Sequence, residues 1–377
     1  MRMLIEKYRE TNKTIYACFI DYNKAFDKVQ HKQLIECLKR IHLDEWDIRL
    51  LCSLYWDQTA TIRCNGERSA PINIKRGVRQ GCILSPCLFN LYTEEIFKDI
   101  NELPGLNING TKINNLRYAD DTVILTESHE ELQHLLTTMN SLSNNYGLSL
   151  NIKKTKTMII TRENDQNIQV NINITGESLE RVHEYVYLGH TITSNGKCET
   201  EIRKRIGMAK STFNNMKQVL TNKQISTELK IRLVKCYVHS TFFYASETWT
   251  LNKTTEKKIE ALEMWIYRRI GRIPWTDKKT NNEVLRQLNV KKDLLNTVKK
   301  RQMRYFGNIK RHNTIIKTIL EGRIQGSRKR GRQRFTWTDN IKRWTGRSIA
   351  ECTSKARDRT EWRSMIANLR CGDGTPR

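Results

Sequence analysis

The sequence predicts an α+β fold, in which a strand-rich first half is followed by an almost wholly helical second half. Apolar runs of strand length, such as Ile15 to Ile20, occur before residue 195, whereas helix-like apolar spacing dominates from residue 199 onward. The 377 residues are 38% hydrophobic, which is enough for two or three packed units. We expect three domains, at residues 1–195, 196–311 and 312–377.

The first half is predicted to be a succession of short elements. Residues 58 to 75 predict strands around Asn65-Gly66, a pair that is typical of tight hairpin turns. The other predicted elements of this half are helices at 29 to 56, 86 to 101 and Glu127 to Tyr146, and strands at 148 to 160 and 168 to 192.

The second half is predicted to be a series of amphipathic helices. They are expected at residues 199 to 221, 225 to 245, 254 to 273, 280 to 288 and 291 to 311. The basic residues of the first of these helices, such as Arg203 and Lys204, face either a nucleic acid duplex or solvent. We expect Trp249 and Trp265 to be core residues rather than base-stacking residues.

Two adjacent carboxylates stand out in the stretch Tyr118-Ala119-Asp120-Asp121. This stretch joins two strand-like runs, so the pair is expected at a hairpin turn. Adjacent like charges repel each other, which invites a divalent cation, although a solvated turn is the other interpretation of the tetrapeptide alone.

A second acidic site is predicted at the end of the apolar run Ile15 to Ile20. Asp21 follows this run directly, whereas Asp27 lies beyond the strand and is less expected to bind metal. One carboxylate at a strand end and a pair on a neighbouring hairpin can hold two Mg²⁺ ions, as phosphoryl transfer requires. Between the acidic runs, Gly77 and Gly81 allow close approach of a ligand to the backbone.

Five motifs in order resemble those of reverse transcriptases, particularly those of non-LTR (LINE-type) retrotransposons. Residues 19 to 27 resemble motif A, 79 to 86 motif B, 118 to 121 motif C, 146 to 155 motif D, and 187 to 189 the primer grip of motif E. The resemblance covers about half of the chain. It implies a right-hand polymerase palm with partial fingers at 1–195, a helical thumb at 196–311, and a basic nucleic-acid-binding tail at 312–377.

The resemblance also implies roles for individual residues. Asp21, Asp120 and Asp121 are the expected catalytic residues and ligands of Mg²⁺ or Mn²⁺. The expected nucleotide-binding residues are Tyr22, Phe26, Gln80, Gly81 and Lys154, and the expected primer-binding residues are Tyr118, Tyr187, Leu188 and Gly189. Phe26 matches the steric gate that rejects a 2′-hydroxyl, and a core phenylalanine is the alternative.

The strong positive charge predicts a polyanionic partner. Lys and Arg number 66 against 40 Asp and Glu, giving a net charge of +26, and nucleic acid fits this excess better than an acidic membrane. The run Arg328, Lys329, Arg330, Arg332 and Arg334 is interpreted as a phosphate-binding arm, with a merely solvated charge run as the alternative. No apolar run is long enough for a transmembrane helix, and the N-terminus is too charged for a signal peptide, so we expect a nuclear and cytoplasmic protein.

The expected function is RNA-directed DNA polymerisation with an RNA template, a DNA primer and deoxynucleoside triphosphates. The chain begins about twenty residues before Asp21, so most of the fingers that precede motif A in the family are expected to be missing and catalysis to be impaired. The alternative is a non-catalytic nucleic-acid-binding remnant of such an element. The ten cysteines form no Cys-x-x-Cys pair. Near the C-terminus, the motif Asp358-Arg359-x-x-Trp362-Arg363 also resembles a tail that recurs in these elements.

Overall fold

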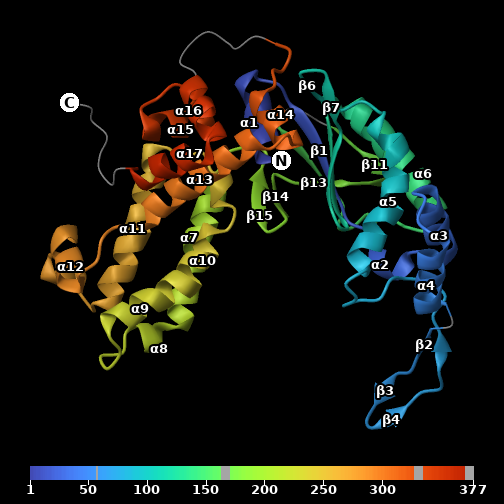
Figure 1. Ribbon diagram of the computed structural model, residues 1–377, viewed down its shortest axis with the longest axis horizontal. Coiled ribbons are helices and arrows are strands. Elements are labelled where there is room, and N and C mark those ends of the chain that lie inside the picture. The colour runs from blue at the N-terminus through green and yellow to red at the C-terminus, as the bar shows by residue number, and fades with distance from the viewer. Residues whose placement is uncertain (57, 163–169, 327–333, 370–377) are drawn as a thin grey trace. The chain divides into compact units, whose positions relative to one another are not determined.

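The computed structural model describes residues 1–56, 58–162, 170–326 and 334–369 of the chain. It divides into two compact units (Figure 1). The first unit contains Thr11–Leu188 and Arg323–Ser327, together with Met1, and the second contains Arg2–Glu10, Gly189–Gly322 and Arg328–Arg377. The predicted mixture of helix and strand is confirmed.

A five-stranded sheet forms the centre of the first unit. Its order is β13 (Glu180–Arg181), β10 (Lys156–Ile160), β1 (Ile15–Ile20), β9 (Asp121–Thr126) and β8 (Asn115–Tyr118). All neighbours are antiparallel except β10 and β13. The central strand β1 is buried along almost its whole length because β9 and β10 flank it and side chains cover both of its faces, so it is a continuous apolar run rather than an alternating one.

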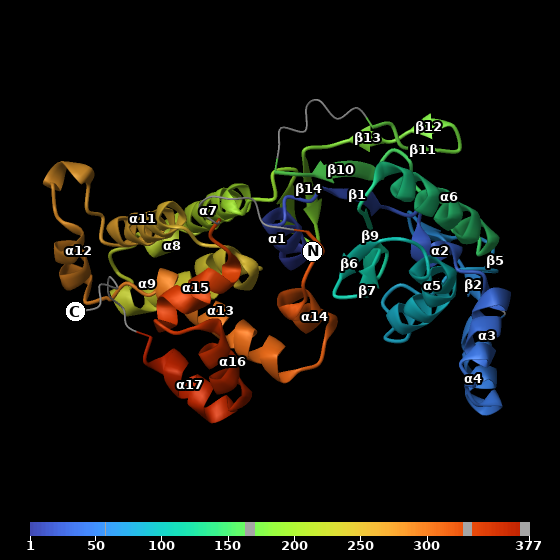
Figure 2. The same ribbon diagram turned by 90° about the horizontal axis from the view of Figure 1, so that it is seen from above.

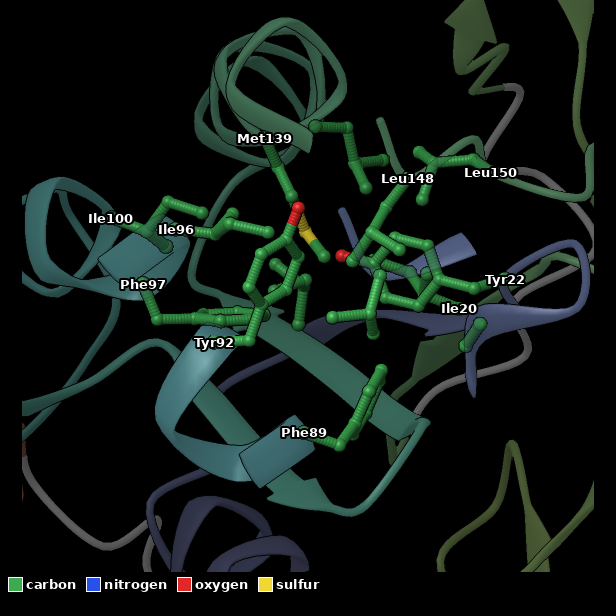
Figure 3. Packing of buried hydrophobic residues seen from close by; sticks show 14 of the residues in the cluster. Ile20, Tyr22, Phe89, Tyr92, Ile96, Phe97, Ile100, Met139, Leu148 and Leu150 are labelled. Carbon is green, nitrogen blue, oxygen red and sulfur yellow. The ribbon is translucent and has the colours of Figure 1, made fainter. Parts of the chain in front are cut away.

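Two long helices supply the apolar side chains that pack on this sheet. They are α5 (Ser85–Asn101), which begins at Ser85-Pro86 as predicted, and α6 (His129–Asn145), whose N-cap Ser128 accepts a hydrogen bond from the Glu131 amide. Figure 3 shows Tyr92 and Phe97 of α5 and Met139 of α6 meeting near Ile20 at the end of β1. This packing fixes the end of β1, where Asp21 follows.

Shorter elements complete the first unit. The Asn65-Gly66 turn is confirmed: both residues have positive φ, 51° and 89°, as a type I′ hairpin requires. The predicted helix at 29 to 56 consists of two helices. The remaining elements are α2 (Ala25–Lys28), α3 (His31–Arg40), α4 (Glu45–Tyr55), β2 (Thr59–Ala60), β3 (Arg63–Cys64), β4 (Glu67–Arg68), β5 (Ile72–Asn73), β6 (Leu106–Ile108), β7 (Thr111–Ile113), β11 (Asn173–Ile174), β12 (Glu177–Ser178) and β14 (Glu184–Tyr187).

The second unit is predominantly helical, as predicted (Figure 2). Its α-helices are α1 (Arg2–Glu10), α7 (Glu199–Asn215), α8 (Lys217–Leu220), α9 (Thr227–Leu233), α10 (His239–Phe243), α11 (Lys253–Ile270), α12 (Asn281–Leu288), α13 (Leu294–Arg311), α14 (Ile315–Glu321), α15 (Trp337–Thr345), α16 (Ile349–Arg357) and α17 (Arg359–Ala367). The unit also contains β15 (His190–Thr193). The single helix predicted at 225 to 245 is confirmed from Thr227 to Phe243, and a π-helical turn at Val234–Val238 lies within it between α9 and α10.

Tryptophans fill the core of the second unit. Trp249, Trp337 and Trp362 are almost completely buried. Trp265 is half-buried and packs against the same core, with the Arg269 guanidinium 3.9 Å from its ring centroid, so the prediction of a core position is confirmed for Trp249 and, at the margin of the core, for Trp265. Among the described residues, no helix is both long enough and apolar enough to span a lipid bilayer.

Candidate active site

Asp21 is held at the end of β1 by the turn that precedes β10. The Asn151 amide donates a hydrogen bond to the Asp21 carbonyl at 2.7 Å, and the Asp21 amide donates one to Thr155 Oγ1 at 3.4 Å. The same turn is closed by hydrogen bonds from the amides of Lys154 and Thr155 to the Asn151 carbonyl. Its geometry therefore places Lys154 beside Asp21, with Nζ 3.8 Å from Asp21 Oδ2.

The other two carboxylates lie on the hairpin between β8 and β9, as predicted. Tyr118 pairs with Asp121, so Ala119 and Asp120 form a two-residue turn, and the positive φ of Ala119 (54°) is of the kind found at the first central position of type II′ turns. β9 is the neighbour of β1, and Ile20 pairs with Thr122. In this antiparallel register the next positions are Asp21 and Asp121, which brings motifs A and C together at one edge of the sheet.

The three carboxylates influence one another electrostatically. The pKa of Asp121 is raised by partial burial and, in addition, by the negative charges of Asp120 and Asp21. Such mutual repulsion among short carboxylates attracts a cation, and the Lys154 ammonium occupies that place beside Asp21.

The donor set fits a hard divalent cation, because it consists of carboxylate oxygens on adjacent backbone positions. In the part of the chain that the structure describes, however, no three His, Cys, Asp or Glu side chains are already arranged around a common metal position. The register of β1, β9 and β8 brings the three residues to neighbouring positions. Asp21, Asp120 and Asp121 are the residues that could hold the ion.

Tyr185 belongs to this site, although the sequence did not indicate it. Its ring stacks on Phe19 of β1 at a centroid distance of 4.1 Å, and its pKa is raised by burial and by the charges of Asp121 and Asp21. The only available signal was the alternation of Tyr185 and Tyr187 along β14, which puts both side chains on one face of the strand. That pattern does not reveal which face carries the carboxylates.

The predicted primer-binding residues differ in their surroundings. Tyr118 is 69% exposed at the hairpin. Tyr187 is buried and donates a hydrogen bond to the Leu116 carbonyl at 3.2 Å; burial, followed by the charge of Asp121, raises its pKa to about 12. Leu188 and Gly189 follow it with positive φ values of 49° and 69°, so the chain turns sharply at the end of β14.

Two of the predicted nucleotide-binding side chains lie within the apolar packing. Tyr22 is 6% exposed, its hydroxyl lies 3.1 Å from Ser143 Oγ of α6, and burial raises its pKa to about 12. Its side chain therefore faces the core. Phe26 is half-buried and stacks on Phe89 at a centroid distance of 4.4 Å, which fits a core phenylalanine, and its role as a steric gate stays a prediction.

The motif B loop is attached to the motif A segment. The Val78 amide donates to the Phe26 carbonyl at 2.8 Å, and Gln80 Nε2 donates to Asp27 Oδ1 at 3.4 Å. Gly77 is required here, because a Cβ atom would lie 3.0 Å from the Asp27 carbonyl oxygen and φ is +97°. Gly81 also has positive φ (+83°) but faces open space, which leaves its backbone accessible.

Of the predicted basic arm, Arg328, Lys329, Arg330 and Arg332 lie outside the described residues. Arg334 is described and exposed. Its positive charge contributes, after burial, to lowering the pKa of Arg9 to about 10. Arg334 therefore adds positive charge near Arg9 of the second unit.

Comparison with known proteins gives the same assignment as the motifs. Residues 1–192 match the family described as reverse transcriptase (RNA-dependent DNA polymerase). An uncharacterized transposon-derived protein of Caenorhabditis elegans is 27% identical over 273 residues, covering 69% of this chain and 98% of that protein. The Pol polyprotein of the type-1 retrotransposable element R2 of Popillia japonica is 28% identical, covering 68% of this chain and 36% of the polyprotein.

A third relative carries an explicit activity in its name. The RNA-directed DNA polymerase from mobile element jockey of Drosophila funebris is 27% identical over 267 residues. The match covers 69% of this chain and 28% of that polymerase. The chain thus spans about a third of the length of the R2 and jockey proteins that it matches.

Proposed function

Since the chain belongs to the reverse transcriptase (RNA-dependent DNA polymerase) family, we propose that it acts as an RNA-directed DNA polymerase. The predicted resemblance to the enzymes of non-LTR retrotransposons is confirmed by the R2 and jockey relatives. The observation that carries the proposal is the register of β1 and β9, which brings Asp21 and Asp121 to neighbouring positions beside Asp120.

The chemistry at this edge of the sheet is nucleotidyl transfer. When bound, Mg²⁺ or Mn²⁺ ions supply activation of the primer 3′-hydroxyl and stabilisation of the departing pyrophosphate. Asp21, Asp120 and Asp121 hold these ions through their carboxylate oxygens. Lys154 lies 3.8 Å from Asp21, where its ammonium neutralises the departing phosphates or donates a proton to them.

The surrounding residues position the substrates. The backbone at Tyr22 flanks the triphosphate, and Phe26, held by stacking on Phe89, fills the space of a 2′-hydroxyl. Gln80 and Gly81 line the sugar on the other side. Tyr118, together with the turn Tyr187, Leu188 and Gly189, supports the primer end.

The larger assignments belong to the same proposal. Residues 1–195 are a polymerase palm with partial fingers, residues 196–311 are a helical thumb, and residues 312–377 are a basic nucleic-acid-binding tail. The partners are an RNA template, a DNA primer and deoxynucleoside triphosphates, which the nucleus and the cytoplasm both supply. The net charge of +26 supports the nucleic acid partners.

Primer extension with Mg²⁺ or Mn²⁺ on an RNA template tests the proposal. Asp120→Asn removes one ligand charge and is expected to lower the extension rate on the order of 10³-fold, corresponding to several kcal/mol of transition-state stabilisation. Asp99→Asn, at an exposed position of α5, is the matched control and should extend like the wild type.

Binding of primer–template should be the same for all three proteins, since binding depends on many distributed phosphate contacts. Equal extension by Asp120→Asn and wild type would remove these carboxylates from the mechanism. Tight binding with no extension by the wild type, at any metal concentration, is the result expected of the alternative, a non-catalytic nucleic-acid-binding remnant.

A further inference from the structure

The tail motif Asp358-Arg359-x-x-Trp362-Arg363 is explained by the packing of α17 on α13. Asp358 is the N-cap of α17 and accepts hydrogen bonds from the amides of Thr360 and Glu361. Trp362 is 1% exposed, and its Nε1 donates to the Met303 carbonyl of α13 at 2.8 Å. The Asp therefore starts the helix and the Trp attaches it to α13, which leaves the two arginines without a structural role.

The contact between the two helices is close because α13 carries a glycine at the crossing. A Cβ atom on Gly307 would lie 2.4 Å from Trp362 Cδ1 and Nε1. The Trp362 ring also packs against Phe306, at a centroid distance of 5.4 Å. The orientation of α17 about its own axis is thereby fixed, and so is the direction in which its other side chains project.

A basic cavity of about 630 Å³ lies between α13 and α17. Five cationic residues line it and no acidic residue does: Lys300, Arg304, Arg311, Arg359 and Arg363. Asn308, Trp362, Ile366 and Ala367 complete the lining. Both arginines of the tail motif thus face the same cavity as three cations of α13, although more than forty residues separate the two helices in the chain.

The cations of this cavity repel one another. Burial, together with the charges of Arg359 and Arg363, lowers the pKa of Arg311. Within the described residues none of the five cations forms an ion pair; the nearby acidic groups are engaged elsewhere, Glu361 with Lys355 and Asp358 with the helix N-terminus. Arg311 Nη1 donates a hydrogen bond to the Ala356 carbonyl at 2.8 Å, whereas the other four cations have no ion-pair partner among the described residues, and Trp362 and Gly307 keep the two helices that carry them together.

We propose that the cavity between α13 and α17 is a binding site for the phosphodiester backbone of nucleic acid. Arginine guanidinium groups bind phosphate oxygens through two parallel hydrogen bonds, and four of the five cations are arginines. On α13 the lining residues run from Lys300 to Arg311, a stripe of about 17 Å, which is the axial length of about five base pairs of a duplex at about 3.4 Å each.

The site is expected to recognise the backbone without reading the sequence. Trp362 is buried and hydrogen-bonded, so it is not free to stack on a base. Asn308 is the one lining side chain among the described residues that could both donate to and accept from a base edge. This site is separate from the carboxylates of the first unit, and the inference does not require polymerase activity.

The test compares the salt dependence of binding for two double variants of the full chain. The probe is a fluorescein-labelled 30-nucleotide single-stranded RNA. Arg359→Gln with Arg363→Gln should make the slope of log K against log salt shallower by about 1.4, because each lost phosphate contact on a single strand contributes about 0.7. Lys253→Gln with Lys257→Gln, at exposed positions of α11, removes the same charge and should leave the slope nearly unchanged.

Two further measurements separate the outcomes. Arg359→Lys with Arg363→Lys retains the charge and should restore the slope, while affinity stays lower than wild type because the bidentate contacts are lost. Equal slopes for the Gln variant and its control would overturn the proposal, as would displacement of the RNA by poly-glutamate as efficiently as by unlabelled RNA. In the Asp120→Asn background the slope change should persist, so failure of catalysis and failure of this site are distinguishable.

Discussion

At the scale of single residues, Asp121 illustrates the conflict between stability and catalysis. Its charge lies among those of Asp120 and Asp21, and the pKa of Asp121 is raised in consequence of burial and of these neighbours. These neighbours disfavour the charged form of Asp121 when no metal is bound, whereas the proposed mechanism needs that charge to hold one. A residue whose charge is unfavourable for folding is therefore a candidate for function.

Asp121→Asn should consequently separate the effect of this charge on stability from its effect on catalysis. Without divalent cations the variant is expected to be as stable as the wild type or more stable, by less than about 1 kcal/mol because the group is exposed. Primer extension should be lost. Chemical unfolding in EDTA and extension in Mg²⁺ measure the two properties, and a variant that is less stable and still active would contradict both assignments.

His239 offers a pH dependence in the second unit. It is 5% exposed in α10; burial, then the nearby charge of Lys235, lowers its pKa to about 4, against the opposing effect of Asp293. The unfolded chain binds this proton below about pH 6.5, whereas the folded chain binds it only near pH 4. Stability is therefore lost as the pH falls from about 6.5 to about 4.

His239→Phe should reduce this loss. The variant retains the aromatic contact with Phe243, whose ring centroid lies 5.8 Å away, and removes the titrating group. Between pH 7 and pH 4.5 the free energy of unfolding should fall by about 1–3 kcal/mol less in the variant than in the wild type. A difference that does not change with pH would mean that His239 takes up its proton in the folded state without cost.

At the scale of elements, features that a few adjacent residues determine were predicted correctly, whereas features that depend on contacts between distant segments were not. The Asn65-Gly66 hairpin and the start of α5 at Ser85-Pro86 were correct because a few adjacent residues determine them. The π-helical turn at Val234–Val238 was missed, since its residues have ordinary helical apolar spacing. Tyr185 was missed for a related reason: alternation assigns it to a face of β14 but not to a neighbour.

Two glycines in long helices should respond in opposite ways to substitution by alanine. Gly307 of α13 has Trp362 at 2.4 Å from the position of an added Cβ, so Gly307→Ala is expected to destabilise the protein by about 1–3 kcal/mol. Gly207 of α7 has no atom within 4 Å, so Gly207→Ala should stabilise by about 0.5–1 kcal/mol. Thermal unfolding of both variants checks this, and a stabilising Gly307→Ala would contradict the packing of α17.

At the scale of the whole molecule, the sequence predicted the family and the positions of the three carboxylates, because five short motifs carry that information in order. It indicated a basic protein without showing where the charge gathers. The cavity between α13 and α17 depends on residues from two helices whose separation in the chain hides their proximity. The net charge therefore predicts that the protein binds nucleic acid, whereas the location of a binding site can be predicted only from the fold.

The basic arm should contribute to binding as a second, independent set of charges. Changing Arg328, Lys329, Arg330 and Arg332 to Gln is expected to make the salt slope for single-stranded RNA shallower by about 2.8. The matched control changes four exposed lysines of the second unit to Gln: Lys223, Lys253, Lys257 and Lys278. If both variants lower the slope equally, the arm is one part of a diffuse positive surface and has no special role.

Helix α1 is synthesised long before the distant residues that it contacts in the folded protein. Its Leu4, Ile5 and Tyr8 are fully buried, α1 packs against α14, and the Glu6 carboxylate accepts a hydrogen bond from the Trp337 amide, 331 residues further along the chain. At about 5–20 residues per second, α1 leaves the ribosome roughly 15–65 s before Trp337 is made. Until Gly196, which lies against Ile5, and then α14 have been synthesised, the apolar face of α1 lacks these native partners, so chaperones that hold nascent chains should associate with residues 2–10.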